Sequence, residues 1–430
     1  MQRVFERSEN LAGVVNVPPD KSISHRAAIL SSLCRGISRI EGYSPGADCR
    51  TTLQCLAMLG ARQSWQGDTL LVEGRGERGF DQPDGPLDCV NSATTMRLLA
   101  GVLAGESVDV TLTGDGSLVR RPMGRIIEPL SLMGAGISAE GEDGRPPLRI
   151  SGGELTGITY SPSVASAQVK SAILLAGLKA QGTTTINEMV KTRDHTERML
   201  DAMGISVRCE GLSVSVEPGL PRPCDLDIPG DISSAAFMIA AALVCPGSEI
   251  TLNDVGLNPT RTAFIDLILR MGADVQVTDE VTGLWEPRGR ITVKYSQLSA
   301  IEVSSDDVAR AIDEIPLIAL LATQAGGRTE IQGAGELRHK EADRLGVTVE
   351  GLSSMGALVE EKPHGMAIEG PRELDGSVVS SRGDHRLAMM FAVAGLAASG
   401  QTTVLDWEFT EISYPCFDGV LNSLGARVVG

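Results

Sequence analysis

The amino-acid sequence predicts an α/β protein of two domains, each built from three copies of one repeated unit. Three observations predict this fold class. A polar segment followed by an apolar helix rich in small residues recurs six times along the chain. A glycine opens a strand-like run after each of these helices, and another glycine further along each repeat closes a second helix. These closing glycines recur at similar intervals from Gly60 to Gly425, which indicates an internal repeat.

The first helix of each repeat is predicted from cap-type residues followed by apolar residues at helical spacing. In the second repeat, the side chains of Asn91 and Ser92 can accept hydrogen bonds from free backbone N–H groups, and apolar residues recur from Met96 to Leu103. The six helix starts are expected near Lys21-Ser22, Asn91-Ser92, Ser166-Ala167-Gln168, Ser233-Ser234, Asp313 and Asp384-His385-Arg386.

The strands and second helices are predicted from glycine positions, because glycine readily adopts the left-handed conformation just past a helix end. The strands open at Gly36, Gly105, Gly182, Gly247, Gly327 and Gly400, and the second helices close at Gly60, Gly134, Gly204, Gly272, Gly356 and Gly425.

Prolines mark the expected domain boundary. Residues 1–17 are predicted to form a short strand pair that ends at Pro18-Pro19, and a proline-rich passage at 218–229 suits a linker between domains. We therefore expect one three-repeat domain at 20–228 and a second formed by 1–19 together with 229–430. A ligand site between two such domains is the default expectation.

Composition excludes several classes of function. The formal net charge of −17 argues against a surface that binds nucleic acid or anionic membranes non-specifically. The longest apolar helix, 235–245, is too short to span a bilayer, and no secretory signal opens the chain. The cysteines show no CxxC pairs, which favours buried free thiols in a reducing cytoplasm. Cys34, Cys55, Cys89 and Cys245 lie in or beside apolar runs.

The helix start at residues 91–97 (Asn-Ser-Ala-Thr-Thr-Met-Arg) suits an anion. Small residues after the cap leave backbone N–H groups open, and the helix dipole adds partial positive charge. An ordinary capped, buried helix is the alternative. The sixfold repetition of the same layout favours the anion site.

Cationic side chains accompany these helix starts. Lys21, Ser22 and Arg26 fall within about one turn, so an ammonium, a hydroxyl and a guanidinium group can meet one phosphate or carboxylate. Arg121 precedes Pro122, which we expect to start a helix, and its guanidinium can bind an anion in bidentate fashion. Solvated basic surface is the alternative for both segments.

The fifth and sixth repeats combine acids with cations. Asp313 and Glu314 stand at the start of an apolar helix; capping explains one acid, and a second makes proton transfer credible. If the charged segment 338–344 is helical, Lys340 and Arg344 share one face and Glu341 lies about 100° away. A salt-bridged surface helix is the alternative for that segment.

Arg386 lies in the first turn of the sixth-repeat helix, where a cation opposes the helix dipole. A bound anion would remove that conflict.

Three further motifs carry little weight. Residues 192–197 resemble a helix start, and metal binding by His195 is disfavoured because no second histidine has ligand spacing. The GxGxxG match at 74–79 is not followed by a helix, and the GxSxG match at 42–46 contains a proline where an oxyanion hole needs an N–H group.

Together, residues 91–97, 21–26, 338–344 and 384–386 closely resemble the 5-enolpyruvylshikimate-3-phosphate synthase family over essentially the whole chain. The resemblance implies an inside-out α/β barrel fold of two domains with three βαβαββ repeats each, joined by two crossover strands and closing on substrate. It also implies the reaction. The 5-hydroxyl of shikimate 3-phosphate adds to C2 of phosphoenolpyruvate, and phosphate leaves from a tetrahedral intermediate, without a cofactor or metal.

The resemblance assigns a role to each matching position. Asp313 is expected to take the 5-hydroxyl proton, Glu341 to protonate the methylene carbon and later deprotonate it, and Lys21 to act with them. Shikimate 3-phosphate is expected at Lys21, Ser22, Arg26, Ser166, Ala167, Gln168, Arg193, Asp313 and Lys340, and phosphoenolpyruvate at Lys21, Ala93, Arg121, Gln168, Arg344 and Arg386.

Three departures from the family pattern stand out. Most members carry glycine where this chain has Ala93, and the added methyl is expected to weaken the inhibitor glyphosate more than the substrate. Glu336 replaces a common asparagine, and no lysine matches the family's C-terminal cation, which aligns near Ile412. Residues 166–168 and 192–196 resemble the glyphosate-insensitive subgroup.

Two other functions remain open from the sequence. A transferase acting on UDP-N-acetylglucosamine shares the fold but expects a reactive loop cysteine, for which Cys89 is the candidate. A non-catalytic anion sensor is disfavoured by Asp313 and Glu341 beside the cations. We expect a cytoplasmic monomer whose partners are the two small anionic substrates, and neither nucleic acid nor membrane.

Overall fold

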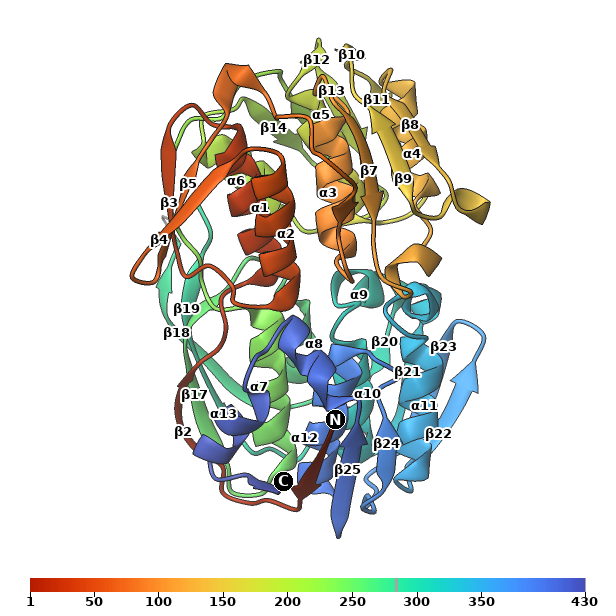
Figure 1. The fold of residues 1–430 in the computed structure, drawn as a ribbon. Helices are drawn as coiled ribbons and strands as arrows, with labels where there is room; N and C mark the ends of the chain where they lie inside the picture. The colour runs from red at the N-terminus through yellow and green to blue at the C-terminus, as the bar shows by residue number, and fades with distance from the viewer. Residues whose placement is uncertain (283–284, 430) are drawn as a thin grey trace. The chain divides into compact units, whose positions relative to one another are not determined.

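The structure, a computed structural model, describes residues 1–282 and 285–429 (Figure 1). The chain divides into two compact units. The continuous unit is Pro19–Ile228, and the split unit joins Met1–Pro18 to Pro229–Gly430. No helix in the described part of the chain is long and apolar enough to cross a membrane.

The continuous unit contains three four-stranded sheets with strand orders β16-β3-β5-β4, β6-β7-β9-β8 and β11-β13-β15-β14. The first repeat consists of α1 (Lys21–Leu33), β3 (Ile37–Glu41), α2 (Ala47–Met58), β4 (Arg62–Gln66) and β5 (Thr69–Glu73). The second consists of β6 (Leu87–Asp88), α3 (Ala93–Leu103), β7 (Asp109–Thr113), α4 (Gly124–Leu132), β8 (Gly136–Ala139) and β9 (Leu148–Ser151). The third consists of β11 (Thr159–Tyr160), α5 (Ala167–Gly177), β13 (Thr184–Asn187), α6 (His195–Ala202), β14 (Val207–Glu210) and β15 (Ser213–Val216), with β16 (Asp225–Asp227) and the pair β10 (Leu155–Thr156) and β12 (Ala180–Gln181) completing the unit.

The split unit contains three sheets of the same kind, ordered β18-β19-β17-β2, β20-β21-β23-β22 and β24-β25-β1-β26. The first sheet is formed around β2 (Ala12–Asn16), α7 (Ile232–Val244), β17 (Glu249–Gly256), α8 (Ala263–Arg270), β18 (Asp274–Val281) and β19 (Arg288–Lys294). The second has β20 (Glu302–Val303), α9 (Ser305–Arg310), α10 (Ile315–Gln324), β21 (Gly327–Gln332), α11 (Arg344–Ser354), β22 (Leu358–Lys362) and β23 (Gly365–Gly370). The third has β24 (Val378–Ser380), α12 (His385–Ala397), β25 (Gln401–Leu405), α13 (Phe417–Ser423), β26 (Arg427–Val429) and β1 (Gln2–Glu6).

Each four-stranded sheet follows one plan, which confirms the predicted α/β class with three repeats in each unit. Each sheet has one parallel pair at one edge, and its remaining pairs are antiparallel, as in β6-β7-β9-β8. Parallel neighbours need a crossover connection, and a buried helix supplies one for β6-β7, β11-β13, β20-β21 and β24-β25. In the other two sheets the parallel partner, β16 beside β3 or β2 beside β17, comes from a distant part of the chain.

The prediction that residues 1–17 form a strand pair is wrong. β1 pairs with β25 and β26, whereas β2 lies parallel to β17 in a different sheet. β1 has a partner strand on each side and β2 has one, and both belong to four-stranded sheets, which are more stable than an isolated two-stranded ribbon.

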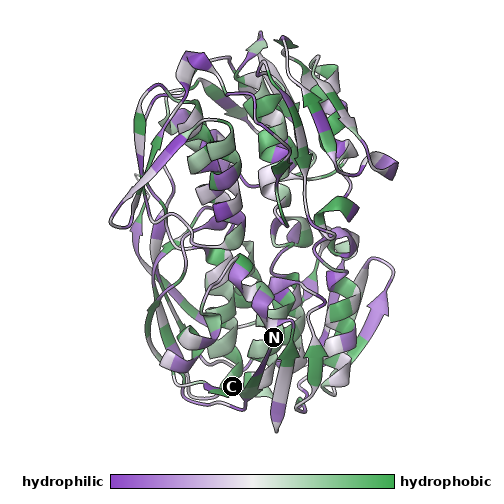
Figure 2. Ribbon diagram, in the orientation of Figure 1, coloured by the Kyte–Doolittle hydropathy of each residue, from purple (hydrophilic) through white to green (hydrophobic). Residues whose placement is uncertain are grey.

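The core of each unit is a cluster of three buried helices. In the continuous unit these are α1, α3 and α5, and in the split unit α7, α10 and α12. Gly101 of α3 lies against α5 so closely that a Cβ atom there would be 2.2 Å from the carbonyl oxygen of Ala172. Small residues in these helices therefore permit close helix packing. Hydrophobic colouring dominates α7, in contrast to the polar strand β22 (Figure 2).

The predicted helix starts and glycine closures are confirmed. The six first helices begin within two residues of the expected positions. The six closing glycines all have a positive φ, between 78° and 105°, just past the ends of α2, α4, α6, α8, α11 and α13.

Candidate functional site

The start of α3 is capped by one of the two predicted residues. The Ser92 hydroxyl accepts a hydrogen bond from the backbone N–H of Thr95 at 3.2 Å, and Ala93, only 5% exposed, is the first helical residue. Asn91 does not cap the helix, contrary to the prediction. Its amide donates to Asp115 at 2.8 Å and its side-chain oxygen accepts from Arg121 at 3.4 Å. Asn91 therefore tethers Arg121 beside the start of α3.

The prediction that Pro122 starts a helix is wrong. The helix α4 begins at Gly124, and Arg121 ends a short 3₁₀ helix, Leu118–Arg120. Pro122 thus lies in the connection before the helix. Arg121 itself is buried, 7% exposed, so it is not part of a solvated basic turn.

Lys21 and Arg26 both belong to α1 but have different partners. The Lys21 ammonium lies 3.0 Å from Asp48 at the start of α2, an ion pair that sequence reasoning missed. Arg26, 4% exposed, donates to Thr196 (2.7 Å), to the backbone oxygen of Ser22 (2.8 Å) and to Ser171 (2.7 Å). Arg26 therefore links α1 to α5 and α6.

The start of α5 is tied to the start of α3. Ser166 caps α5 by accepting from the backbone N–H of Val169. Gln168 donates to the Thr94 hydroxyl at 2.9 Å and accepts from Arg97. With Arg26 linking α1 to α5, the predicted residues Lys21, Ala93, Ser166, Ala167 and Gln168 all lie at the N-terminal ends of three helices packed together.

Arg193 lies in the connection that leads into α6, and a buried ion-pair cluster holds that connection. Lys170 of α5, 1% exposed, contacts Glu188 at 3.0 Å, Glu197 at 2.6 Å and the backbone oxygen of Thr192 at 3.4 Å. Sequence reasoning missed Lys170, because a lysine inside an apolar helix gives no sign of which acids it meets.

In the split unit, Arg344 is the centre of the predicted acid and cation cluster. Its guanidinium, 1% exposed, donates to Asp313 at 3.0 Å, to Glu341 at 2.6 Å and to Asp384 at 2.7 Å. Lys340 reaches Asp313 at 3.5 Å. Burial alone would lower the pKa of Arg344. The neighbouring Asp384, Glu341 and Asp313 outweigh burial and hold that pKa above its ordinary value.

The segment that supplies these residues is not one helix, so the helical arrangement considered for 338–344 does not occur. A 3₁₀ helix covers Ala334–His339, Lys340 is extended, and α11 begins only at Arg344 with Asp343 as its cap. Lys340, Glu341 and Arg344 nevertheless meet around Asp313 because the break turns the backbone between them.

Arg386 lies in the first turn of α12, as predicted, and faces a second buried chain of side chains. Its guanidinium is 3.9 Å from Glu314, which accepts from Ser233; Ser233 in turn accepts from Arg261 at 2.6 Å. Sequence reasoning missed Arg261. The repeat itself carried the signal, because Arg261 precedes the closing Gly272 by the same interval that separates Arg193 from Gly204.

Other candidates are placed away from these clusters. Cys89 is buried, and its contact with Cys55, together with burial, raises the pKa of its thiol, so it does not resemble a reactive loop cysteine. Ile412, where the family's lysine aligns, is buried in the 3₁₀ helix Trp407–Ile412. Across 1–282 and 285–429, no group of three metal-ligating side chains is placed to hold a metal ion.

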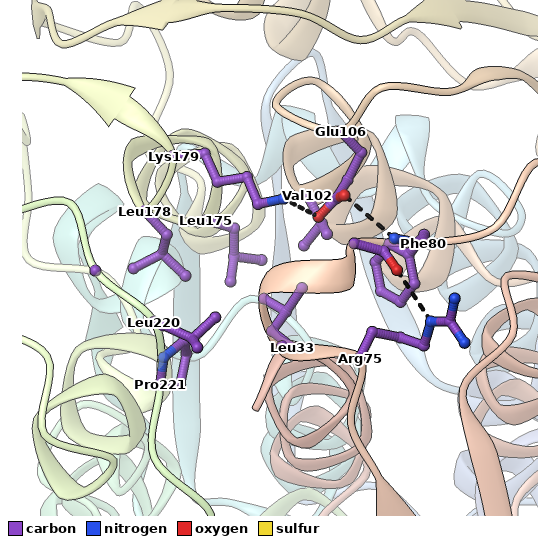
Figure 3. Close-up of a pocket in the computed structure, with 13 residues that line it drawn as sticks. Leu33, Arg75, Phe80, Val102, Glu106, Leu175, Leu178, Lys179, Leu220 and Pro221 are labelled. Atoms are coloured by element: carbon purple, nitrogen blue, oxygen red, sulfur yellow. Dashed lines mark hydrogen bonds and ion pairs between the residues drawn. The ribbon is translucent and has the colours of Figure 1, made fainter. Parts of the chain in front are cut away.

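A pocket in the continuous unit lies at the opposite ends of its buried helices (Figure 3). Leu33, Val102 and Leu175 line it near the C-terminal ends of α1, α3 and α5, beside the Lys179–Glu106 ion pair. Part of the glycine-rich segment 74–79 is here too, as the 3₁₀ helix Gly76–Arg78. None of the predicted site residues is among those that line this pocket.

Comparisons with known proteins identify the family of this chain. Residues 5–421 match the family described as EPSP synthase (3-phosphoshikimate 1-carboxyvinyltransferase). Proteins named 3-phosphoshikimate 1-carboxyvinyltransferase from Brevibacillus brevis and Geobacillus kaustophilus are 46% and 48% identical, over 97% and 96% of this chain and 98% of each relative.

Solved structures show the same fold. EPSP synthase from Acinetobacter baumannii superposes with a TM-score of 0.88 at 40% identity, covering 100% of this chain and 99% of that one. The enolpyruvyl transferase NikO from Streptomyces tendae, at 19% identity and a TM-score of 0.80, shares the fold. The match over nearly all of the sequence, at identities of 46% and 48%, places this chain in the EPSP synthase (3-phosphoshikimate 1-carboxyvinyltransferase) family.

Proposed function

We propose that this enzyme transfers the enolpyruvyl group of phosphoenolpyruvate to the 5-hydroxyl of shikimate 3-phosphate and releases phosphate. The observation that carries the proposal is the Arg344 cluster, in which two acids, Asp313 and Glu341, share one buried guanidinium. Family membership supplies the reaction, and the cluster supplies acids beside a cation that can bind an anionic substrate.

The continuous unit is proposed to bind anions. Lys21, Ser22, Arg26, Ser166, Ala167, Gln168 and Arg193 hold shikimate 3-phosphate in this proposal, and Lys21, Ala93, Arg121 and Gln168 contact phosphoenolpyruvate. Three helix N-termini at one end of this unit support the assignment, because their backbone N–H groups and dipoles favour negative charge.

The split unit is proposed to move the protons. Asp313 takes the proton of the attacking hydroxyl, and Glu341 donates a proton to the methylene carbon, which gives a tetrahedral intermediate. Glu341 then removes a proton from the new methyl group as the C–O bond to phosphate breaks. Arg344, Arg386 and Lys340 balance the substrate charges. Residues 20–228, and 1–19 with 229–430, are proposed as the two functional domains.

A coupled assay tests the proposal. Purified protein is supplied with phosphoenolpyruvate and either shikimate 3-phosphate or UDP-N-acetylglucosamine, and released phosphate is measured. Phosphate release that depends on shikimate 3-phosphate is expected. Release only with UDP-N-acetylglucosamine would show that this sugar is the acceptor. No release with either acceptor would favour the non-catalytic anion sensor.

We further propose that Ala93 weakens the binding of glyphosate, as in the glyphosate-insensitive subgroup that the sequence resembles. Its methyl group occupies space at the start of α3, where a discrimination of roughly 1–3 kcal/mol per carbon is usual. Because glyphosate is longer than phosphoenolpyruvate, we expect the Ala93 methyl group to disturb its binding more. Ala93→Gly should lower the inhibitory concentration of glyphosate about tenfold or more, with a smaller change in KM for phosphoenolpyruvate. Equal inhibition of both proteins would end this proposal.

The enzyme is proposed to act as a monomer in the cytoplasm. Light scattering after size-exclusion chromatography should give one chain's mass, 45.3 kDa, and fractionation of cells should recover the activity in the cytoplasmic fraction. A dimer mass would overturn the first statement.

A further inference from the structure

A chain of buried side chains in the continuous unit runs from α1 through α2 to the cap of α3. Nδ1 of His25 is 2.6 Å from the Thr52 hydroxyl, which is 2.7 Å from the Thr95 hydroxyl, which donates to Ser92 Oγ at 2.7 Å. All four residues are at most 1% exposed. Water therefore does not compete for these hydrogen bonds.

The direction of this chain is fixed because each hydroxyl carries one hydrogen. Thr95 gives its hydrogen to Ser92, so Thr52 must donate to Thr95, and Nδ1 of His25 must then donate to Thr52. The alternative acceptor for Thr52, the backbone oxygen of Asp48, lies 3.5 Å away and is a much weaker partner.

His25 is suited to start such a chain. Burial, with further contributions from Lys21 and Arg26 that outweigh Asp20, holds the pKa of His25 well below its ordinary value. The ring is therefore neutral, with its hydrogen on Nδ1. Nε2 has no hydrogen-bond partner among the described residues, which suits a nitrogen without a hydrogen.

The far end of the chain is the Ser92 hydroxyl. Ser92 Oγ accepts from both the backbone N–H and the hydroxyl of Thr95, which uses its two lone pairs. Its own hydrogen has no acceptor among the described residues and must point away from Thr95. Ser92 immediately precedes Ala93, whose backbone is proposed to face phosphoenolpyruvate.

We propose that His25, Thr52 and Thr95 orient the Ser92 hydroxyl as an additional donor to the anionic group of phosphoenolpyruvate. Ser92 is then a further substrate-binding residue, and His25 is a positioning residue that acts through the two threonines. This inference rests on the proposed function, because it takes the anion at the start of α3 to be phosphoenolpyruvate.

Kinetics of isosteric variants test the inference. Ser92→Ala and Thr95→Val should each raise KM for phosphoenolpyruvate about tenfold, while KM for shikimate 3-phosphate stays within about twofold, because one hydrogen bond to a charged group is lost or misdirected. Thr95→Ser keeps the hydroxyl and should restore the wild-type value. The double variant should be no weaker than Ser92→Ala alone, since both changes remove the same interaction.

A matched control separates orientation from general destabilisation. Thr184 of β13 is also fully buried, and its hydroxyl has no hydrogen-bond partner among the described residues, so Thr184→Val should leave both KM values unchanged. Unchanged KM for phosphoenolpyruvate in Thr95→Val, or an equal rise for both substrates, would overturn the inference.

The direction of the hydrogen bonds from His25 to Ser92 can be measured without an activity assay. Long-range ¹H–¹⁵N spectra of the wild type report the tautomer of each histidine, and His25→Asn identifies the His25 signal. The Nδ1–H tautomer is expected; the Nε2–H tautomer would overturn the inference even in an active enzyme. Absence of phosphate release by the wild type would instead refute the proposed function, whatever the tautomer.

Discussion

The two units hold a buried guanidinium group in different ways. Arg26 of the continuous unit donates to two hydroxyl groups and one backbone carbonyl, and these three acceptors are uncharged. Arg344 of the split unit donates to three carboxylates. Hydroxyl and carbonyl acceptors orient a guanidinium group through hydrogen bonds. Carboxylates place acids beside the cation, which suits proton transfer.

Removing one acid from the split unit should give the largest effect. Glu341→Gln keeps the shape of the side chain and an oxygen for Arg344, but it cannot exchange a proton. We expect kcat to fall by at least about 100-fold, because proton transfer by a placed carboxylate commonly contributes 10²–10⁴ in rate. Phosphate release in single turnovers measures this. The exposed Glu350→Gln is the control, and near-normal turnover in Glu341→Gln would remove the acid from the mechanism.

Removing each guanidinium tests the comparison directly. Arg344→Met leaves Asp313, Glu341 and Asp384 without their buried cation, and breaking such a pair costs about 3–5 kcal/mol. Arg26→Met leaves uncharged acceptors unsatisfied, which costs about 1–3 kcal/mol. Urea unfolding of both variants should therefore show the greater loss for Arg344→Met. Equal losses would mean that the charge of the acceptors does not matter here.

Arg386 tests substrate binding by the split unit. Its 3.9 Å separation from Glu314 is longer than a hydrogen bond, so its side chain is less committed to protein partners than that of Arg344. We expect Arg386→Ala to lower kcat/KM for phosphoenolpyruvate by about ten- to a hundredfold. Initial rates at varied phosphoenolpyruvate measure this, and a full-rate variant with unchanged affinity would place Arg386 outside the site.

The smallest expected effect concerns Glu197, a buried acid that contacts Lys170 inside the continuous unit. Burial raises the pKa of Glu197, with Lys170 opposing. The folded chain therefore holds this proton more tightly than the unfolded chain. Its contribution to the free energy of unfolding is greatest below the ordinary pKa of 4.5 and is lost as pH rises through the raised value.

Glu197→Gln should remove that dependence. The unfolding free energy of the variant, relative to the wild type, should increase as the pH is raised from about 4 to about 7. Urea titrations across this range give the difference, and a difference that is flat or falls with pH would contradict the assignment.

The repeated elements could be predicted from sequence because their signals are local. Cap residues, small apolar helices and closing glycines each act within a few residues, and they located all six buried helices. The roles of Asp313, Glu341 and Arg344 came from the family resemblance, and the structure places these three in one cluster.

What sequence reasoning missed depends on contacts between distant segments. Asp48 and Lys170 meet their partners across elements, so nothing near them in the sequence marks the pairing. Asn91 is a residue type that often caps helices, but its side chain forms hydrogen bonds with Asp115 and Arg121 instead. The N-terminal strands were mispaired for the same reason, since their partners β17, β25 and β26 all lie in the second half of the chain.

The placement of β1 has a consequence for how the chain is made. Its partner strands β25 (Gln401–Leu405) and β26 (Arg427–Val429) are synthesised long after it, so the first strand must wait for them. At about 5–20 residues per second, that wait is about 20–80 s. The continuous unit has every strand of its sheets within 19–228 and can fold in that interval. Vectorial synthesis would thus let the continuous unit form before the split unit has received β25 and β26.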